Sequence, residues 1–327
     1  MPETKEHLAD RLLAKIRTRP NHSFKIEVMA KSFKTEIASI IEALSLLADW
    51  GYKIKSDAKS ITFIEPPDLY LSDEVRYKLK TKLIAKEVLA YQSVQSTNTI
   101  AQVLAASGAK DGTLIVSEYQ KKGRGRLGRK WYSSANLGLY CSIILKPKIN
   151  PSVAPGISLI AALAMVETIK SYTEEDVRIK WPNDVLINGR KVCGILTEML
   201  GEFNRTHFVV VGVGVNINHR RQDIPDEIKK TASSIRLASG RKIKRVKFLQ
   251  EFLVKFENEY ILFKNNGLDK SRKRIIKYST LIGHRINLKI GSKTISGNVL
   301  DIDDKGQLVV ETGGKRAVFS AGEVTLS

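Results

Sequence analysis

Residues 123–131 read GRGRLGRKW and place four positive charges and three glycines within nine residues. Arginine guanidinium groups bind phosphate and carboxylate oxygens in pairs, and glycine lets backbone N–H groups approach a polyanion closely. The residue types therefore predict a loop that binds a phosphate-bearing ligand. A solvated basic turn is the alternative, because basic surface loops are common.

Two known phosphate-binding patterns nearly fit this loop, and both fail. The glycines satisfy G-x-G-x-x-G, but a dinucleotide-binding turn opens a helix and precedes an acidic residue by about 20 positions. The stretch 132–150 contains no acidic residue. A P-loop needs Lys and then Ser or Thr after its last glycine, whereas Gly128 is followed by Arg-Lys. What remains is a glycine- and arginine-rich loop that follows an apolar strand at 113–119.

The composition limits the class of protein. With 327 residues, the chain is long enough for two or three domains with their own cores. The longest apolar runs, such as 207–217, are too short to span a bilayer, and the N-terminus lacks a basic then apolar leader. Cys141 and Cys193 lie in apolar stretches without a C-x-x-C pattern, as small buried residues do. A cytoplasmic protein without a membrane span is expected.

The net charge of +20 is distributed unevenly along the chain. Residues 1–68 carry 11 Lys or Arg against 10 Asp or Glu, whereas residues 241–290 carry 14 against 4. The basic excess therefore does not lie at the N-terminus. Apolar residues within 243–256 recur at helical spacing, so the basic residues between them are expected on a solvated face and not in a nucleic-acid groove.

The hydrophobic pattern predicts an α+β protein whose first unit is residues 1–66. Two helical faces at spacings of three and four occur within 8–16 and 37–47, with a short helix around 26–30, and an alternating hairpin follows at 52–63. The second face consists of Ile37, Ile40, Ile41, Leu44 and Leu47. Three helices and a hairpin predict a winged helix-turn-helix. Its helix at 35–47 has few cations, so operator binding stays open.

Two prolines at 66 and 67 mark the start of a second unit, residues 67–275. Ser72 is expected to cap a helix that begins near Asp73. Several strand-like runs in this unit are too close for helical crossovers, so a mixed sheet with hairpins is predicted and not a doubly wound sheet. Residues 276–327 contain four strand candidates separated by turns, which predict a small β-barrel.

Five motifs together resemble those of the bacterial biotin protein ligases. They are QSTN (95–98), EYQKKGRGRLGRKW (118–131), KWPNDV (180–185), VCGILTE (192–198) and GVGVNIN (212–218). The resemblance covers most of the chain and includes the N-terminal winged helix of the bifunctional form, which is also the biotin operon repressor. It implies a class II synthetase-like biotin/lipoyl ligase fold for the central unit and an SH3-like C-terminal barrel. It also implies synthesis of biotinyl-5'-AMP from biotin and ATP, followed by transfer of biotin to a lysine of a biotin carboxyl carrier domain.

This chemistry requires fixed positive charge, because a carboxylate must approach the α-phosphorus of ATP. Lys180 is the candidate that bridges the biotin carboxyl group and the phosphate, and Arg126 is the second catalytic candidate. By resemblance, biotin is bound by Ser96, Thr97, Asn98, Gln120, Arg124, Gly125, Arg126 and Lys180. The nucleotide is bound by Arg124, Arg126, Arg129, Trp131 and Asn216.

The resemblance also implies cofactors and partners. Mg²⁺ is expected with ATP, and Asp184 and Glu198 are candidates to position it, although the sequence gives no metal-ligand geometry. Expected partners are the carrier domain of acetyl-CoA carboxylase or of another biotin-dependent enzyme, operator DNA, and a second copy of the chain in a ligand-promoted homodimer. Two other functions stay open. A lipoate protein ligase would share the fold and the adenylation step, and a biotin-sensing regulator without ligase activity would not need the arginine loop.

Overall fold

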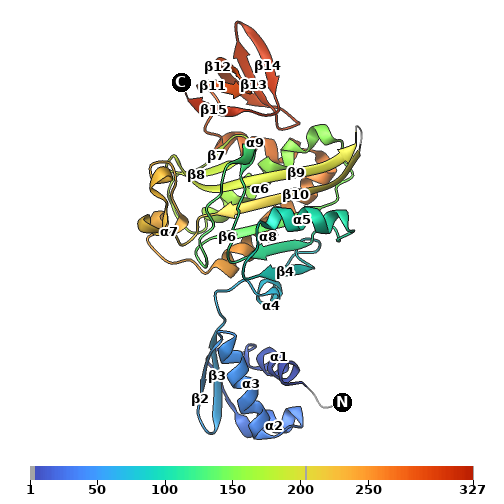
Figure 1. Ribbon diagram of the computed structural model, residues 1–327, viewed down its shortest axis with the longest axis vertical. Helices are drawn as coiled ribbons and strands as arrows, with labels where there is room; N and C mark the ends of the chain where they lie inside the picture. Colours follow the sequence, from blue (N-terminus) through green and yellow to red (C-terminus); the bar gives the residue numbers. More distant parts are fainter. Residues whose placement is uncertain (1–3, 203–204, 327) are drawn as a thin grey trace. The chain divides into compact units, whose positions relative to one another are not determined.

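The computed structural model describes residues 4–202 and 205–326 (Figure 1). The chain divides into two compact units, Met1–Asp68 and Leu69–Ser327. The smaller unit ends close to the prolines that the sequence offered as a boundary. The larger unit includes the C-terminal strands as well as the central sheet, so these two regions form one compact body.

Three helices and a three-stranded antiparallel sheet, in the order β1-β3-β2, make up the smaller unit. Its elements are α1 (Lys5–Ile16), β1 (Ser23–Lys25), α2 (Ile26–Phe33), α3 (Ile37–Asp49), β2 (Lys53–Ser56) and β3 (Ser60–Glu65). The Thr4 hydroxyl caps α1 by accepting the His7 N–H, and α2 ends where Lys34 adopts a left-handed φ of 55°. The expected helices and hairpin are present, while β1 was missed because three residues are too few to show a period.

The apolar residues of α3 do not all point inward. Ile40 and Leu47 are buried in the core of the smaller unit, as predicted. Ile37 and Ile41 were predicted on the same face, but they are 43% and 55% exposed. The prediction was wrong because the buried arc of the helix is centred nearer to Ala43, which leaves these two isoleucines at the outer edge of the apolar stripe.

A seven-stranded mixed sheet forms the centre of the larger unit, in the order β4-β5-β6-β10-β9-β8-β7. Its strands are β4 (Val88–Tyr91), β5 (Leu114–Ser117), β6 (Leu139–Leu145), β7 (Val177–Lys180), β8 (Asp184–Ile187), β9 (Arg190–Glu202) and β10 (Arg205–Val215). β4 and β5 are parallel, whereas the other neighbouring strands are antiparallel. This arrangement confirms the predicted mixed sheet, with hairpins where the strands follow one another too closely for helices.

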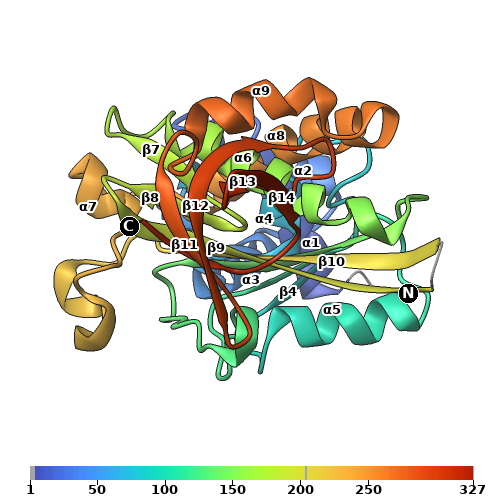
Figure 2. The same ribbon diagram turned by 90° about the horizontal axis from the view of Figure 1, so that it is seen from above.

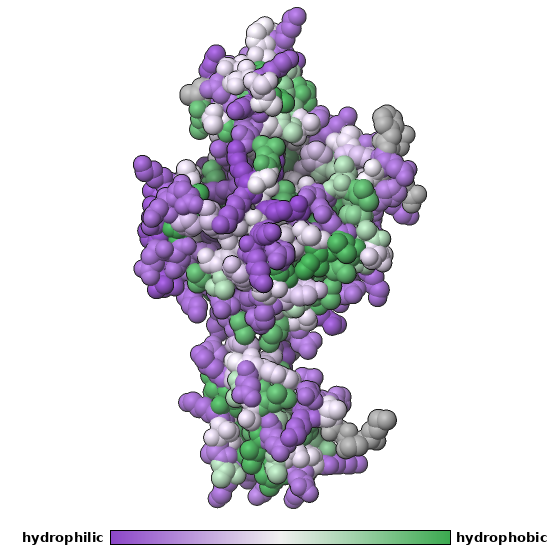
Figure 3. Space-filling view, in the orientation of Figure 1, coloured by the Kyte–Doolittle hydropathy of each residue, from purple (hydrophilic) through white to green (hydrophobic). Residues whose placement is uncertain are grey.

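Helices cover both faces of this sheet. They are α4 (Ser72–Arg76), α5 (Thr97–Ala106), α6 (Pro155–Ile169), α7 (Ile235–Ser239), α8 (Arg245–Asn266) and α9 (Asp269–Tyr278). Because side chains alternate along a strand, Leu114 and Val116 enter the main core with α6 and α8, while Ile115 packs against α5. Figure 1 shows α5 in front of the sheet and α6 and α8 behind it. Apolar residues of α5 reach the surface in Figure 3, among otherwise mostly hydrophilic residues.

The helix α6 lies in the main core. The segment Pro151–Ile169 is long and apolar enough to cross a membrane by length and composition. The prediction that the apolar runs are too short to span a bilayer did not take this segment into account. Most of this segment is buried inside the larger unit. A helix that is apolar on all sides and enclosed by protein has the environment of a core helix.

The C-terminal strands form a five-stranded antiparallel sheet in the order β14-β13-β12-β11-β15. They are β11 (Arg285–Ile290), β12 (Lys293–Ile302), β13 (Leu308–Thr312), β14 (Lys315–Phe319) and β15 (Glu323–Leu326). Figure 2 shows how the sheet curls upon itself. The sequence predicted four strands, with 316–326 as one. That prediction was wrong because the chain turns at residues 320–322, and β15 then pairs with β11 at the opposite edge.

Two local predictions in the larger unit need correction. Ser72 does not cap a helix from outside, since α4 begins at Ser72 itself and the Ser72 hydroxyl donates to the Val88 carbonyl at 2.9 Å. The apolar face of α8 is buried as expected, with Phe248 and Phe256 fully enclosed. Arg245 is also buried, however, although a basic residue in this helix was expected on the solvated face.

Candidate active site

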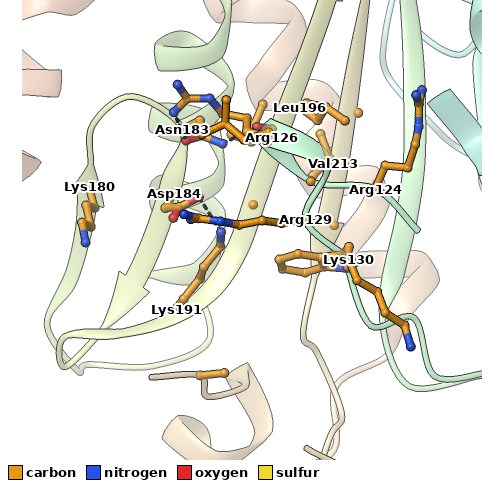
Figure 4. A pocket seen from close by; sticks show the side chains of 18 of the residues that line it. Arg124, Arg126, Arg129, Lys130, Lys180, Asn183, Asp184, Lys191, Leu196 and Val213 are labelled. Atoms are coloured by element: carbon orange, nitrogen blue, oxygen red, sulfur yellow. Dashed lines mark hydrogen bonds and ion pairs between the residues drawn. The ribbon is translucent and has the colours of Figure 1, made fainter. Parts of the chain in front are cut away.

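A cavity of about 430 Å³ lies over the β10, β9 and β8 strands of the central sheet. Every residue to which the sequence assigned a catalytic role, or a role in binding biotin or the nucleotide, lines it, whereas of the two magnesium candidates Asp184 lines it and Glu198 does not. The catalytic and substrate-binding residues are Ser96, Thr97, Asn98, Gln120, Arg124, Gly125, Arg126, Arg129, Trp131, Lys180 and Asn216. They come from segments more than 100 residues apart, so the fold brings the motifs together in one place (Figure 4).

The floor of the cavity depends on glycines of the GVGVN motif. A Cβ atom on Gly214 would lie 2.5 Å from the indole ring of Trp131, and one on Gly212 would overlap the Asn98 amide. Both glycines belong to β10, where alternate residues face the same side of the sheet. Their missing side chains therefore make room for the two side chains that form the floor.

A network of buried hydrogen bonds organises the end of the cavity next to α5. The Ser142 hydroxyl contacts Asn98 Oδ1 at 2.6 Å and Thr97 Oγ1 at 2.8 Å. Gln120 Oε1 accepts the Thr97 N–H at 2.9 Å, and its Nε2 donates to the Ser133 hydroxyl at 3.0 Å. These groups are already paired with one another, so they hold the shape of a narrow, partly polar slot.

Ser96 differs from its neighbours in this slot. Its side chain is buried and lines the cavity, and its hydroxyl has no hydrogen-bond partner among the residues that the structure describes. Ser96 occupies the N-cap position of α5, but its side chain makes no capping hydrogen bond. The hydroxyl is therefore available to a polar group of a ligand.

The arginine loop, residues 121–130, closes the cavity from the opposite side. Gly125 N donates to the Arg129 carbonyl at 2.7 Å, and a single turn at Arg126–Gly128 reverses the chain. Gly128 has a φ of 73°, and Leu127, at the tip, has a φ of 55°. The loop is thus a tight hairpin that projects its arginine side chains over the floor.

Each of the three loop arginines contacts a different part of the larger unit. Arg124 Nη2 is paired with the Glu198 carboxylate of β9 at 3.1 Å. Arg126 Nη1 donates to Asn183 Oδ1 at 3.1 Å, as Figure 4 shows, and Arg129 forms an ion pair with Glu323 of β15. Burial lowers the pKa of Arg126 from its ordinary value, with Asp184 and Glu323 opposing that effect. Arg126 is therefore the loop arginine whose charge is partly removed from water.

Besides Lys130 of the arginine loop, two lysines line the cavity, and only one of these two was predicted. Lys191 Nζ lies 2.7 Å from Asp184 Oδ1 and 5.5 Å from the centre of the Trp131 ring, so its position is fixed from two sides. Lys180 ends β7, and its amino group has no ion-pair partner within residues 4–202 and 205–326. Figure 4 draws the Lys180 amino group pointing away from Arg126. Both lysines can supply positive charge to an anion in the cavity.

Some residues that line or support the cavity gave no recognisable signal in the sequence. Ser142 lies in a continuous apolar strand, and the segment 228–232, which forms one wall, has no motif. Asn216 holds this wall, since its Nδ2 donates to the Ser233 carbonyl at 3.0 Å. Lys191 could have been found, because the INGRK turn places it on a strand next to the KWPND motif.

The described side chains do not gather in a metal-binding cluster. No group of three His, Cys, Asp or Glu residues suited to a metal ion occurs in the described part of the chain. Asp184 is paired with Lys191, and Glu198 with Arg124. Magnesium in nucleotide sites takes one or two carboxylates together with substrate phosphates, so these two carboxylates still fit an ion that is bound mainly by ATP.

A slot with fixed hydrogen-bonding groups at one end and an arginine cluster at the other suits an enzyme that activates a small acid with a nucleotide. Residues 90–216 match the Biotin/lipoate A/B protein ligase family, and residues 281–327 match the biotin protein ligase C terminal domain. The chain is 37% identical to the Bifunctional ligase/repressor BirA of Bacillus spizizenii over 273 residues, which are 83% of this chain and 84% of that protein. The chain therefore belongs to the biotin protein ligase family.

Further relatives agree with this assignment. The Biotin--[acetyl-CoA-carboxylase] ligase of Mycobacterium tuberculosis is 33% identical over 235 residues, which are 70% of this chain and 85% of that protein. The biotin protein ligase from Aquifex aeolicus in complex with biotin and ATP has a TM-score of 0.63 and 30% identity, over 74% of this chain and 99% of that chain.

Proposed function

We propose that the protein joins biotin to ATP, forming biotinyl-5'-AMP and pyrophosphate, and then transfers biotin to a lysine of a carboxyl carrier domain. The observation that carries this proposal is that one cavity contains both the hydrogen-bonded slot and the arginine loop. The names of the relatives and the match at residues 281–327 to a biotin protein ligase C terminal domain support biotin over lipoate. The arginine loop argues against a regulator without ligase activity, because biotin alone carries no phosphate.

The slot beside α5 is proposed to bind the ring end of biotin. Ser96 offers a free hydroxyl, and Thr97 and Gln120 fix the depth of the slot through their mutual hydrogen bonds. Asn98 supports the floor, since both ends of its amide are engaged by Ser142, Leu196 and Glu198. A ligand that lacks matching polar groups would leave polar groups of the slot unpaired. The site should therefore discriminate against such ligands.

The arginine loop and the lysines are proposed to hold the anionic groups. In the first step, a biotin carboxylate oxygen attacks the α-phosphorus, a new O–P bond forms, and pyrophosphate leaves with the electrons of the broken P–O bond. Arg124, Arg126 and Arg129 would clamp phosphate oxygens. Lys180 and Lys191 would place positive charge between the two reacting anions. When bound, Mg²⁺ would neutralise phosphate charge, and Asp184 and Glu198 are the carboxylates proposed to position it.

In the second step, the amine of the carrier lysine attacks the carbonyl carbon of biotinyl-AMP. The bond between that carbon and the phosphate oxygen breaks, AMP leaves, and the amine loses a proton. No protein nucleophile is required, because the mixed anhydride is already activated. Trp131 and Asn216 are proposed to bind the nucleotide from the floor and the wall. The Trp131 indole N–H is buried and, in the described part of the chain, unpaired, so it can donate to a ligand acceptor.

One assay tests this proposal. Purified full-length protein would be incubated with ATP, Mg²⁺ and biotin, with and without a biotin carboxyl carrier domain, and AMP and pyrophosphate would be measured. Pyrophosphate should be released with biotin alone, and AMP should accumulate only with the carrier domain. Parallel reactions with lipoate should release neither. Preference for lipoate, or biotin binding without pyrophosphate release, would contradict the proposal.

We further propose that the smaller unit is a winged helix-turn-helix that binds operator DNA. Its helices α1, α2 and α3 and its β2–β3 hairpin have the element order of such a domain, and the first relatives are named as repressors. Because residues 1–68 are nearly neutral, few phosphates can be neutralised by one copy, so a ligand-promoted dimer that reads two half-sites is expected. Gel-shift titration of the chain's own biotin-gene promoters with and without biotinyl-AMP tests this, and ligand-independent monomeric binding would contradict it.

A further inference from the structure

The C-terminal sheet contributes a carboxylate to the cavity. Gly322, Glu323 and Val324 line it, and the Glu323 carboxylate forms an ion pair with Arg129 of the arginine loop. Figure 4 shows Arg129 extending across the cavity toward Asp184. An acidic side chain thus lies where the proposed function requires phosphate charge, which calls for an explanation.

The position of Glu323 is set by the fold of β15. Glu323 is paired with Lys289 and Val324 with Leu288 on the neighbouring strand β11. Val324 is buried in the main core, and because side chains alternate along a strand, Glu323 points to the opposite side, toward the loop. The carboxylate is therefore held by a strand and not by a free end of the chain.

The sheet that carries Glu323 is itself fastened to the catalytic core. The indole N–H of Trp181 donates to the Gly306 carbonyl in the β12–β13 turn at 3.0 Å. Arg272 of α9 donates to the Ile302 carbonyl at 2.5 Å. These contacts hold the C-terminal sheet against the catalytic core. The ion pair with Glu323 therefore restrains Arg129 and the loop that carries it.

The ion pair is strong enough to position the loop and weak enough to be displaced. The Arg129 side chain is 69% exposed and that of Glu323 is 33% exposed, so water and salt screen their attraction. A polyphosphate offers several anionic oxygens in place of one carboxylate and can take over the guanidinium. Glu323 also acts on Arg126, since its charge opposes the loss of the Arg126 proton.

We propose that Glu323 is a positioning residue that holds Arg129, and with it the arginine loop, against the C-terminal sheet until the phosphates of ATP displace the carboxylate. This inference rests on the proposed function. It predicts that the Glu323 charge competes with ATP for the loop and therefore raises the KM for ATP. Because the competition affects the ground state and the transition state equally, kcat should not change.

Three full-length proteins test the inference: wild type, Glu323→Gln and Glu311→Gln. Glu311 is an exposed carboxylate on β13 of the same sheet and does not line the cavity, so its variant has the same change of charge. The first measurement is the rate of tryptic cleavage within residues 121–130 of the ligand-free proteins, mapped by mass spectrometry. The second is the KM for ATP, the KM for biotin and kcat in pyrophosphate release.

For Glu323→Gln, cleavage within the loop should be several-fold faster, and the KM for ATP should fall by about two- to five-fold, the range of an exposed ion pair. The KM for biotin and kcat should equal those of wild type, Glu311→Gln should match wild type throughout, and the difference in KM should shrink at high salt. Unchanged cleavage and an unchanged or higher KM for ATP in Glu323→Gln would overturn the inference.

The proteolysis arm separates this inference from the proposed function. Ligand-free cleavage does not depend on any substrate. The same cleavage in the presence of inorganic pyrophosphate gives a second measurement on the loop. If no biotin-dependent pyrophosphate release occurs but Glu323→Gln is still cleaved faster, the proposed function fails and the restraint by Glu323 stands. If release is normal and the two proteins are cleaved alike, the function stands and the restraint fails.

Discussion

Glu118 Oε2 lies 2.6 Å from Arg245 Nη1, and both side chains are at most 3% exposed. The other oxygen of Glu118 accepts the Tyr70 N–H at 2.6 Å, and the Arg245 guanidinium lies 4.8 Å from the centre of the Tyr70 ring. This buried pair joins the start of the larger unit to α8 and to the residue two positions before Gln120. The position of the slot therefore depends on a contact between segments far apart in the sequence.

Replacing Glu118 with Gln should strongly destabilise the larger unit. The change removes the carboxylate that pairs with the buried Arg245 guanidinium, and breaking a buried pair in this way costs about 3–5 kcal/mol of unfolding free energy. Urea unfolding followed by tryptophan fluorescence measures the loss. The control is Asp176→Asn, which breaks the exposed Asp176–Arg178 pair and should cost less than about 1 kcal/mol. Equal, small losses for both variants would show that the buried pair is not needed.

Lys180→Ala and Lys191→Ala should each reduce biotinyl-AMP formation by more than about 100-fold, because each removes a preorganised positive charge from the cavity. Folding should hardly change in either variant. The exposed Lys293→Ala serves as the control and should be fully active. Single-turnover formation of biotinyl-AMP is the measurement. A lysine variant that forms the intermediate at nearly the wild-type rate removes that lysine from the proposed catalytic set.

Gly214→Ala should abolish binding in the cavity while the chain still folds. The added methyl group would lie 2.5 Å from the Trp131 ring and displace the ring into the cavity. Val318→Ala is the control, because Val318 is exposed on β14 and does not line the cavity. Calorimetric titration with biotin and ATP compares the two. Normal binding by Gly214→Ala would mean that Trp131 does not shape the site.

Arg126→Gly should still form biotinyl-AMP but release it early. Arg126 is the half-buried arginine at the centre of the loop, and its contact with Asn183 fastens the loop over the cavity. Without it, the reactive intermediate should escape and biotinylate exposed lysines of an unrelated protein, which a blot for biotin detects. If the variant modifies its carrier domain normally and leaves the bystander as unlabelled as wild type does, the loop does not retain the intermediate.

His219 should make stability depend on pH. Burial lowers the pKa of His219 to about 4, with the nearby Asp223 opposing the shift. In the unfolded chain the pKa is about 6.5, so as pH falls below 6.5 the unfolded state takes up a proton that the folded state does not, and stability is lost down to pH 4. Between pH 7 and pH 5 the loss is about 2 kcal/mol. His219→Gln should lack this component, and identical pH profiles would contradict the prediction.

Residues within one motif could be predicted, whereas pairs between distant segments could not. Arg126 and the glycines of its loop predict a phosphate site, because the residue types that such a site needs all occur within nine positions. Ser142 and Glu323 carry no such local signal, since each looks like an ordinary strand residue. Their proximity to the cavity arises from strand order, which places β6 beside β10 and β15 beside β11.

The same limit explains the errors in the fold. Periodicity showed that Ile37 and Ile41 lie on an apolar stripe, but only packing decides which part of the stripe is covered. Arg245 was assigned to the solvated face because a charge is seldom buried without a partner, and its partner, Glu118, lies 127 positions away. Local pattern thus predicted the elements, and tertiary pairing decided the exceptions.

The strand β6, which borders the cavity that would hold an acylating agent, also carries a thiol, that of Cys141, whose side chain is packed in the main core on the opposite face of the strand. A thiolate that reached the cavity would compete with the carrier lysine and trap biotin as a thioester on the enzyme. Burial raises the pKa of Cys141 to about 12, so at neutral pH the sulfur remains protonated and is a poor nucleophile. The apolar residues that enclose the thiol on β6 therefore keep it from being acylated by the reactive intermediate. Biotin remains available to the amine of the carrier lysine.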